Sequence, residues 1–109
     1  MAQLQQPRDW QQIAALYDML VRQTGSPVAE LNRAVAVAEL EGAEAGLTVL
    51  GGLELDQYRY FHSARAELLR RAGREDEAQD AYQRALDLAQ TEAERRSLRN
   101  QLARLRLPE

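Results

Sequence analysis

The stretch SPVAELNRAVAVAEL, residues 26–40, constrains the fold more than any other part of the chain. Ser26 followed by Pro27 predicts a helix start, because a serine hydroxyl can cap the first turn and proline is tolerated at the first helical position. On a helical wheel, apolar residues cover most of both sides of this segment, and Asn32 and Glu39 form a narrow polar strip. Such a helix has to lie between neighbours. We therefore expect a helical protein with further helices before and after this one.

Six helices are predicted from the spacing of apolar residues, from capping residues and from glycines that end helices. Asp9 and Thr91 are predicted N-caps, and Glu94 completes a capping box with Thr91. No alternating pattern typical of a β-strand is present, so the predicted fold class is all-α. The expected helices cover residues 10–24, 27–40, 43–50, 58–72, 75–89 and a final segment that follows Thr91.

The middle four helices contain an internal repeat. Gly42 and Gly73 are 31 residues apart, and each lies between a longer helix and the one that follows it. Residues 66–85 have the spacing of a tetratricopeptide (TPR) repeat, whereas the earlier unit is degenerate, with Leu47 and Gly51 at positions where alanine and an aromatic residue are expected. We predict two stacked helical hairpins, with the first and sixth helices covering the ends. The first helix carries an apolar stripe made of Trp10, Ile13, Leu16, Tyr17, Leu20 and Val21.

Composition limits the class of protein. The chain has 109 residues, 45% of them hydrophobic, which is enough for one domain with a modest core. We expect a single domain over residues 9–107 and a tail or junction over residues 1–8. There is no cysteine, no secretory signal and no apolar run long enough to span a bilayer, so a cytoplasmic location is expected and no membrane association. The net charge of −3 gives no overall attraction to nucleic acid.

Three segments resemble a known family. They are DWQQIAALY at residues 9–17, SPVAELNRAVA at 26–36 and ARAELLRRAGR at 64–74. Together they resemble the C-terminal extension of a group of extracytoplasmic-function (ECF) sigma factors, in which a TPR-like domain follows the two sigma regions. The resemblance extends over about residues 9–107, and the segment at 26–36 is its most specific part.

The resemblance implies a part in bacterial transcription initiation. Both sigma regions, which bind polymerase and read promoter DNA in that family, are absent from the chain, so we interpret it as an isolated regulatory or contact domain. The implied partners are the sigma regions of the same polypeptide, the RNA polymerase core or a regulator. One alternative is a free-standing TPR-like adaptor or homodimer. Another is a small-molecule sensor that uses the cleft between the second and fourth helices.

Candidate binding residues follow from the TPR register. When Gly42 and Gly73 are taken as the turns, eight side chains are expected to face the inner groove: Asn32, Ala36, Glu39, Tyr60, Ser63, Glu67, Arg70 and Arg71. A shallow polar groove of this kind could hold a peptide or a neighbouring segment of the same polypeptide. The alternative is a solvated face.

Two arginines are candidates for structural ion pairs. Arg65 lies in the middle of an apolar arc, which is costly unless the charge is paired. An ion pair between helices would satisfy it, and Arg33 is expected to act similarly in the earlier hairpin. The carboxylates considered for Arg65 are those of Asp18, Asp56, Glu77 and Asp80.

The sequence contains no pattern that indicates catalysis or a cofactor. His62 is the only histidine, and with no cysteine a transition-metal site is not expected. Five arginines lie in the sixth helix, but its start is acidic and no aromatic residues interleave, so a solvated face is favoured over a nucleic-acid site. No nucleophile with a base and no phosphate-binding loop is present. We expect a domain that is not an enzyme and works through protein contacts.

Overall fold

A computed structural model describes residues 9–106 of the chain. Within this part there are six α-helices and no strand, which confirms the all-α prediction. The helices are α2 (Trp10–Thr24), α3 (Pro27–Glu41), α4 (Ala43–Leu50), α5 (Arg59–Arg71), α6 (Glu75–Leu88) and α7 (Glu92–Arg106). The predicted tail, residues 1–8, and the last residue of the predicted domain, residue 107, lie outside the described part.

The predicted helix starts are set by local hydrogen bonds. The backbone N–H of Gln12 donates to Asp9 Oδ1 over 3.2 Å, and that of Ala29 donates to Ser26 Oγ over 3.2 Å. At α7 the N–H of Glu94 donates to Thr91 Oγ1 over 3.1 Å. The N–H of Thr91 donates in return to Glu94 Oε1 over 3.3 Å. Each cap satisfies backbone donors that a helix leaves unpaired at its first turn.

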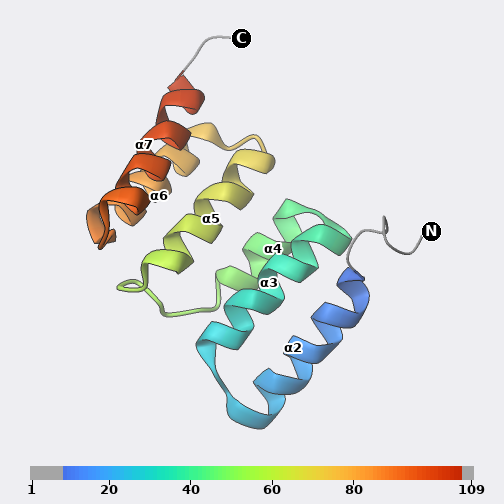
Figure 1. The fold of residues 1–109 in the computed structure, drawn as a ribbon. Helices are drawn as coiled ribbons and strands as arrows, with labels where there is room; N and C mark the ends of the chain where they lie inside the picture. Colours follow the sequence, from blue (N-terminus) through green and yellow to red (C-terminus); the bar gives the residue numbers. More distant parts are fainter. Residues whose placement is uncertain (1–8, 107–109) are drawn as a thin grey trace, which may run out of the picture.

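The helices stack in chain order (Figure 1). α2 packs on α3, α3 on α4, α4 on α5, α5 on α6 and α6 on α7, and α3 also touches α5. Two hairpins, α3–α4 and α5–α6, therefore lie side by side, with α2 and α7 at the two ends. Gly42 lies directly before α4 and Gly73 lies two residues before the start of α6, and their φ angles are positive, 102° and 81°. The prediction that each glycine lies between the two helices of its hairpin is confirmed, but the turns differ in length, because one residue separates α3 from α4 and three separate α5 from α6.

The core consists of two clusters. The first joins α3, α4 and α5 and contains the buried side chains of Leu31, Ala34, Ala38, Leu50, Phe61 and Leu68. The second joins α5, α6 and α7 and contains those of Ala66, Leu69, Ala78, Ala81, Tyr82 and Leu102. α5 contributes to both clusters. α2 contributes to neither, and none of its residues is buried.

The two hairpins differ at the contact between their helices. α4 approaches α3 closely at Gly46, where an added Cβ would lie 2.8 Å from the Cβ of Ala38 and 2.9 Å from the carbonyl oxygen of Ala34. Such distances leave no room for a side chain, so glycine is needed for this packing. The TPR register expected the small residue one position later, at Leu47. The contact has shifted by one residue, which is why the earlier repeat looks degenerate.

Candidate protein-interaction surfaces

The predicted groove residues do not form one surface. Four of them, Glu39, Glu67, Arg70 and Arg71, form an ion-pair network that links α3 to α5. Nη2 of Arg71 lies 2.6 Å from Oε2 of Glu39. Nη2 of Arg70 lies 2.6 Å from Oε2 of Glu67. The hydroxyl of Tyr82 in α6 donates to Oε1 of Glu67 over 3.2 Å, so the network reaches a third helix.

This network shifts the ionisation of its members. The hydrogen bond from Arg70 to Glu67 raises the pKa of the arginine. Burial raises the pKa of Tyr82, and the neighbouring negative charge of Glu67 raises it further. Both carboxylates are already paired with cations. The network therefore acts first as a structural tie between the two hairpins, and a ligand would have to displace an internal partner from it.

Tyr60 and Ser63 lie in a different hollow, of about 170 Å³, between α5, α6 and the start of α7. Arg59 makes two contacts in this hollow. Its Nε lies 2.9 Å from Oε2 of Glu94, and its guanidinium lies 4.4 Å from the centre of the Tyr60 ring. The pKa of Glu94 is lowered, first by the backbone N–H of Gln90 and then by Arg59. Glu94 thus caps α7 and also joins it to α5.

Asn32 and Ala36 occupy two further environments. Asn32 is exposed and lines a third hollow, between α3 and α2. Ala36 has 0% of its surface exposed, so it cannot contact a partner and its placement in the groove was wrong. An alanine suits a close helix contact as well as a groove floor, and the TPR register alone does not separate the two.

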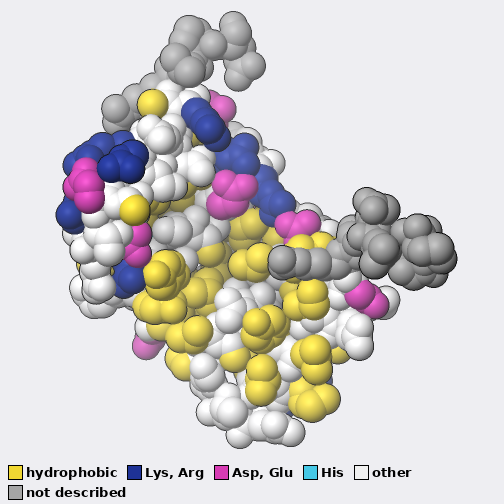
Figure 2. All heavy atoms as spheres, in the orientation of Figure 1, with side chains coloured by type: hydrophobic (Ala, Val, Ile, Leu, Met, Phe, Trp, Pro, Cys, Tyr) yellow, Lys and Arg dark blue, Asp and Glu magenta, His cyan; other side chains and the backbone are white. Residues whose placement is uncertain are grey.

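The hollow beside Asn32, which we call the α2–α3 groove, is predominantly apolar. It has a volume of about 630 Å³. Its lining consists of one polar residue and seven apolar or aromatic ones: Trp10, Ile13, Leu16, Tyr17, Met19, Leu20, Asn32 and Val35. Figure 2 shows hydrophobic side chains gathered over α2 and α3, whereas charged side chains gather over α7.

Three side chains of α2 give the groove its apolar rim. Leu16 is 54% exposed, Met19 53% and Leu20 43%. The sequence predicted an apolar stripe on this helix, with the helix covering the end of the stack. The stripe is present, but it is broader than the strip that α3 covers. The prediction that α2 finishes the end of the fold is therefore only partly correct.

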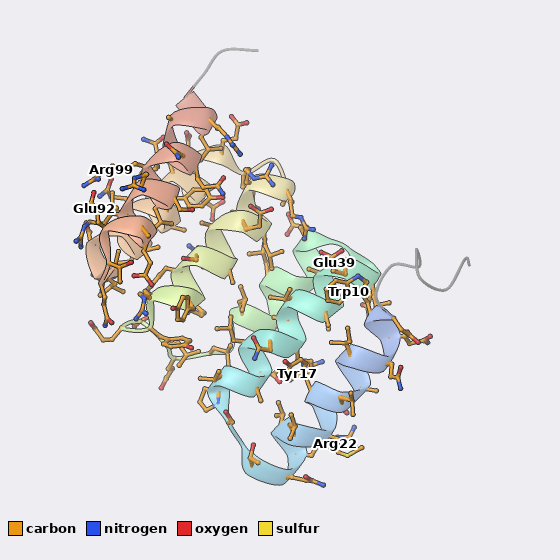
Figure 3. All side chains as sticks on the ribbon, viewed as in Figure 1. Trp10, Tyr17, Arg22, Glu39, Glu92 and Arg99 are labelled. Carbon is orange, nitrogen blue, oxygen red and sulfur yellow. The ribbon has the colours of Figure 1, made fainter. Side chains whose placement is uncertain are left out.

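The labelled side chains show where the groove lies along the hairpin (Figure 3). Trp10 and Glu39 lie at the same end of the antiparallel pair α2–α3, Tyr17 lies near its middle and Arg22 near the other end. The groove thus runs along much of α2. The side chain of Glu39 is 28% exposed and pairs with Arg71, so the ion-pair network adjoins one end of the α2–α3 hairpin.

The two predicted structural arginines make weaker or more local contacts than expected. Nη2 of Arg65 lies 4.0 Å from Oε2 of Glu77, one of the four predicted partners, and both side chains are partly exposed. Nη2 of Arg33 lies 2.8 Å from Oε2 of Glu30 in the same helix. The expectation that Arg33 links two helices was wrong, because an acid three residues earlier on α3 is the nearer partner. Its hydrogen bond lowers the pKa of Glu30.

A fourth hollow, of about 420 Å³, lies between α4, the loop after it and α5. His62 and Arg65 line it together with leucines and Phe61. Nε2 of His62 lies 2.8 Å from the carbonyl oxygen of Asp56, so this buried ring ties the loop to α5. Among residues 9–106, no group of histidine or acidic side chains is arranged to hold a metal ion. No helix in that range is long and apolar enough to cross a membrane.

The chain is similar in sequence to part of a longer bacterial protein. An uncharacterized protein of Rhizobium meliloti (strain 1021) is 44% identical over 99 residues, a match that covers 89% of this chain and 23% of the relative. The chain thus spans about a quarter of the length of this relative. No protein-family profile matches the chain, and no solved structure matches it.

Proposed function

We propose that this chain is a protein-interaction and regulatory domain of an ECF-type sigma factor. In this proposal it has no catalytic activity of its own, lies in the bacterial cytoplasm and acts in transcription initiation through contacts with the sigma regions, the polymerase core or a regulator. The observation that carries the interaction role is the open, apolar α2–α3 groove. The link to sigma factors comes from the resemblance of residues 9–17, 26–36 and 64–74.

The shape of the groove suits an α-helix as the bound element. Two antiparallel helices form its walls, and the exposed residues Leu16, Met19 and Leu20 recur at three and four positions along α2. An amphipathic helix with an apolar stripe can lay that stripe between two such walls. Each of the three side chains is about half exposed, so covering one would contribute on the order of 1 kcal/mol from apolar burial.

The surface charges support a protein partner over nucleic acid. Two arginines of the basic helix α7 are held by an acid on the same helix, since Arg95 lies 3.2 Å and Arg99 3.3 Å from Glu92. The chain carries a net charge of −3. The pairing with Glu92 reduces the positive charge that α7 offers to phosphate groups, and the net negative charge of the chain gives no overall attraction to nucleic acid.

The proposal is tested by immobilising the chain at low density and measuring which candidate partners it captures from solution. The sigma regions of an ECF-type sigma factor from the same organism and core RNA polymerase are offered separately. We expect retention of at least one of them, and we expect Leu16→Glu to abolish it, because a carboxylate would be placed on the apolar rim. Ala103→Glu is the matched control, since it adds the same charge to an exposed position on α7.

Two further variants examine the predicted groove residues. Asn32→Ala changes a side chain of the α2–α3 groove, and Glu39→Lys breaks the ion pair with Arg71. If Leu16→Glu and Asn32→Ala both lose capture while Glu39→Lys still captures the partner, the contact lies in the α2–α3 groove. Failure of both proteins to bind the unmodified chain at high concentration would contradict the sigma-factor role and leave the free-standing adaptor as the better description.

A further inference from the structure

The hollow between α4 and α5 contains the arginine that the sequence placed in an apolar arc. Arg65 lines this hollow, which has a volume of about 420 Å³. In the described part of the chain, its guanidinium reaches one carboxylate, with Nη2 4.0 Å from Oε2 of Glu77. In four other arginines the corresponding distance is 2.6–2.9 Å. A separation of 4.0 Å is too long for a hydrogen bond, so Arg65 keeps N–H donors for another acceptor.

The rest of the lining is largely apolar and is held in place by the fold. Nε2 of His62 donates to the carbonyl oxygen of Asp56 over 2.8 Å, which ties the loop side of the hollow to α5. A preformed hollow with an apolar lining and few polar groups is typical of a small-molecule site. Five apolar side chains from α4, the loop and α5 line it: Leu47, Leu50, Leu53, Phe61 and Leu69.

The charges around the hollow favour a ligand with one negative charge. The charged residues of the lining are Arg65, Arg74 and Asp56, whose side chains sum to +1. Glu44 and Glu77 lie near the two arginines but do not line the hollow. Their side chains are 63% and 53% exposed, so water and salt weaken their effect. A ligand with two negative charges would be repelled by Asp56.

We propose that this hollow binds a small carboxylic acid with an apolar body, in its ionised form. The carboxylate accepts two parallel hydrogen bonds from the guanidinium of Arg65, the geometry in which arginine recognises carboxylates best. The apolar body lies against the leucines and Phe61 of the lining, where it is removed from water. The volume of the hollow falls within the range of about 300–1,000 Å³ that is usual for ligand sites.

This site is separate from the α2–α3 groove, because no residue lines both hollows. The proposal therefore does not rest on the proposed function. A ligand in the hollow contacts α4 of one hairpin and α5 of the next, which are neighbours in the stack (Figure 1). It binds the folded chain, so the melting temperature should rise with ligand concentration.

The test uses phenylacetate as the probe and phenylacetamide as its uncharged counterpart of the same shape. Amide NMR spectra of the ¹⁵N-labelled full chain are recorded while each compound is added, up to about 10 mM. We expect phenylacetate to shift the signals of residues 50–53 and 61–65 with a Kd below about 1 mM. Phenylacetamide should bind at least about tenfold more weakly. Shifts that do not saturate, or equal binding of the two compounds, would overturn the proposal.

Three variants separate Arg65 from a general effect of charge. Arg65→Gln should weaken the binding of phenylacetate at least about tenfold. Arg104→Gln, which removes the same charge from an exposed position on α7, should leave it unchanged. Asp56→Asn removes the negative charge of the lining and should tighten binding about twofold or more.

The third variant keeps the test independent of folding, because a misfolded chain does not bind more tightly. Circular dichroism verifies that all three variants keep their helical content. Unchanged binding in a folded Arg65→Gln would contradict the proposal, and so would weaker binding in a folded Asp56→Asn.

Discussion

The two end helices of this domain have the same length but finish the fold differently. α7 packs three leucines, Leu98, Leu102 and Leu105, against the second core cluster and faces outwards with charged side chains. α2 buries none of its residues and leaves Leu16 and Leu20 in contact with water. A repeat array needs a polar outer face at its end to remain apart from other chains. The comparison therefore identifies α7 as a closed end and α2 as an open one.

The largest expected difference between the ends is in stability. Leu69→Ala removes a side chain that is 0% exposed in the cluster beside α7, and we expect it to lower the free energy of unfolding by about 2–5 kcal/mol. Leu20→Ala on α2 removes one that is 43% exposed, and under about 1 kcal/mol is expected in dilute solution. Urea denaturation measures both. Equal losses would mean that α2 is covered in the monomer and that the ends do not differ.

A second comparison concerns the hairpin next to the open end. Gly46→Ala places a Cβ 2.8–2.9 Å from Ala38 and Ala34, so α3 and α4 must separate. We expect a loss of about 1–3 kcal/mol by thermal or urea unfolding. Gly52→Ala is the control, because its Cβ would meet only ordinary contacts, at 3.9 Å. A neutral Gly46→Ala would show that this hairpin is more loosely packed than the one next to α7.

Substitutions in the ion-pair network that links α3 to α5 and α6 are expected to lower the free energy of unfolding by less. Tyr82→Phe removes the hydroxyl that donates to Glu67 and should cost about 1 kcal/mol. Arg71→Ala breaks a partly exposed pair with Glu39 and should cost only about 0.2–1 kcal/mol. A double-mutant cycle of Arg71 with Glu39 isolates that pair. A larger coupling energy would indicate that the network is a stronger tie than its exposure suggests.

Acid should weaken the closed end through Glu94. The backbone N–H of Gln90, the side chain of Arg59 and the backbone N–H of Thr91 lower its pKa below the ordinary value of 4.5. The carboxylate is thus stabilised in the folded state, so its contribution is present above about pH 4.5 and is lost as the pH falls through the lowered folded pKa. The pH dependence of the urea midpoint measures the effect, and Glu94→Gln should show a shallower decline in acid. An unchanged slope in Glu94→Gln would exclude this carboxylate as its source.

Local signals in the sequence were sufficient to predict where the helices lie and in which order they stack. Capping residues such as Ser26 and Thr91 act within one turn, and the predicted helix bounds agree with the structure to within about one residue. The repeat placed Gly42 and Gly73 between helices, which is where the structure has them.

The candidate site was less predictable, because it depends on how helices meet. Ala36 is small enough for either a groove or a helix contact, and the structure buries it. Arg33 had an acid one turn away, Glu30, that competed with any partner on another helix. The apolar stripe on α2 was evident in the sequence. Which part of it stays exposed depends on the width of the contact with α3, and periodicity does not report that width.

The most direct test of the open end is a backbone amide NMR map of the contact. A ¹⁵N-labelled chain at a concentration where it is monomeric is compared with and without unlabelled sigma regions of an ECF-type sigma factor. We predict that the shifted or broadened signals lie in α2 and on the face of α3 near Asn32 and Val35, while α7 is unaffected. Changes confined to α7 or to the α5–α6 hairpin, or no change at all, would contradict the assignment of the α2–α3 groove as the docking surface.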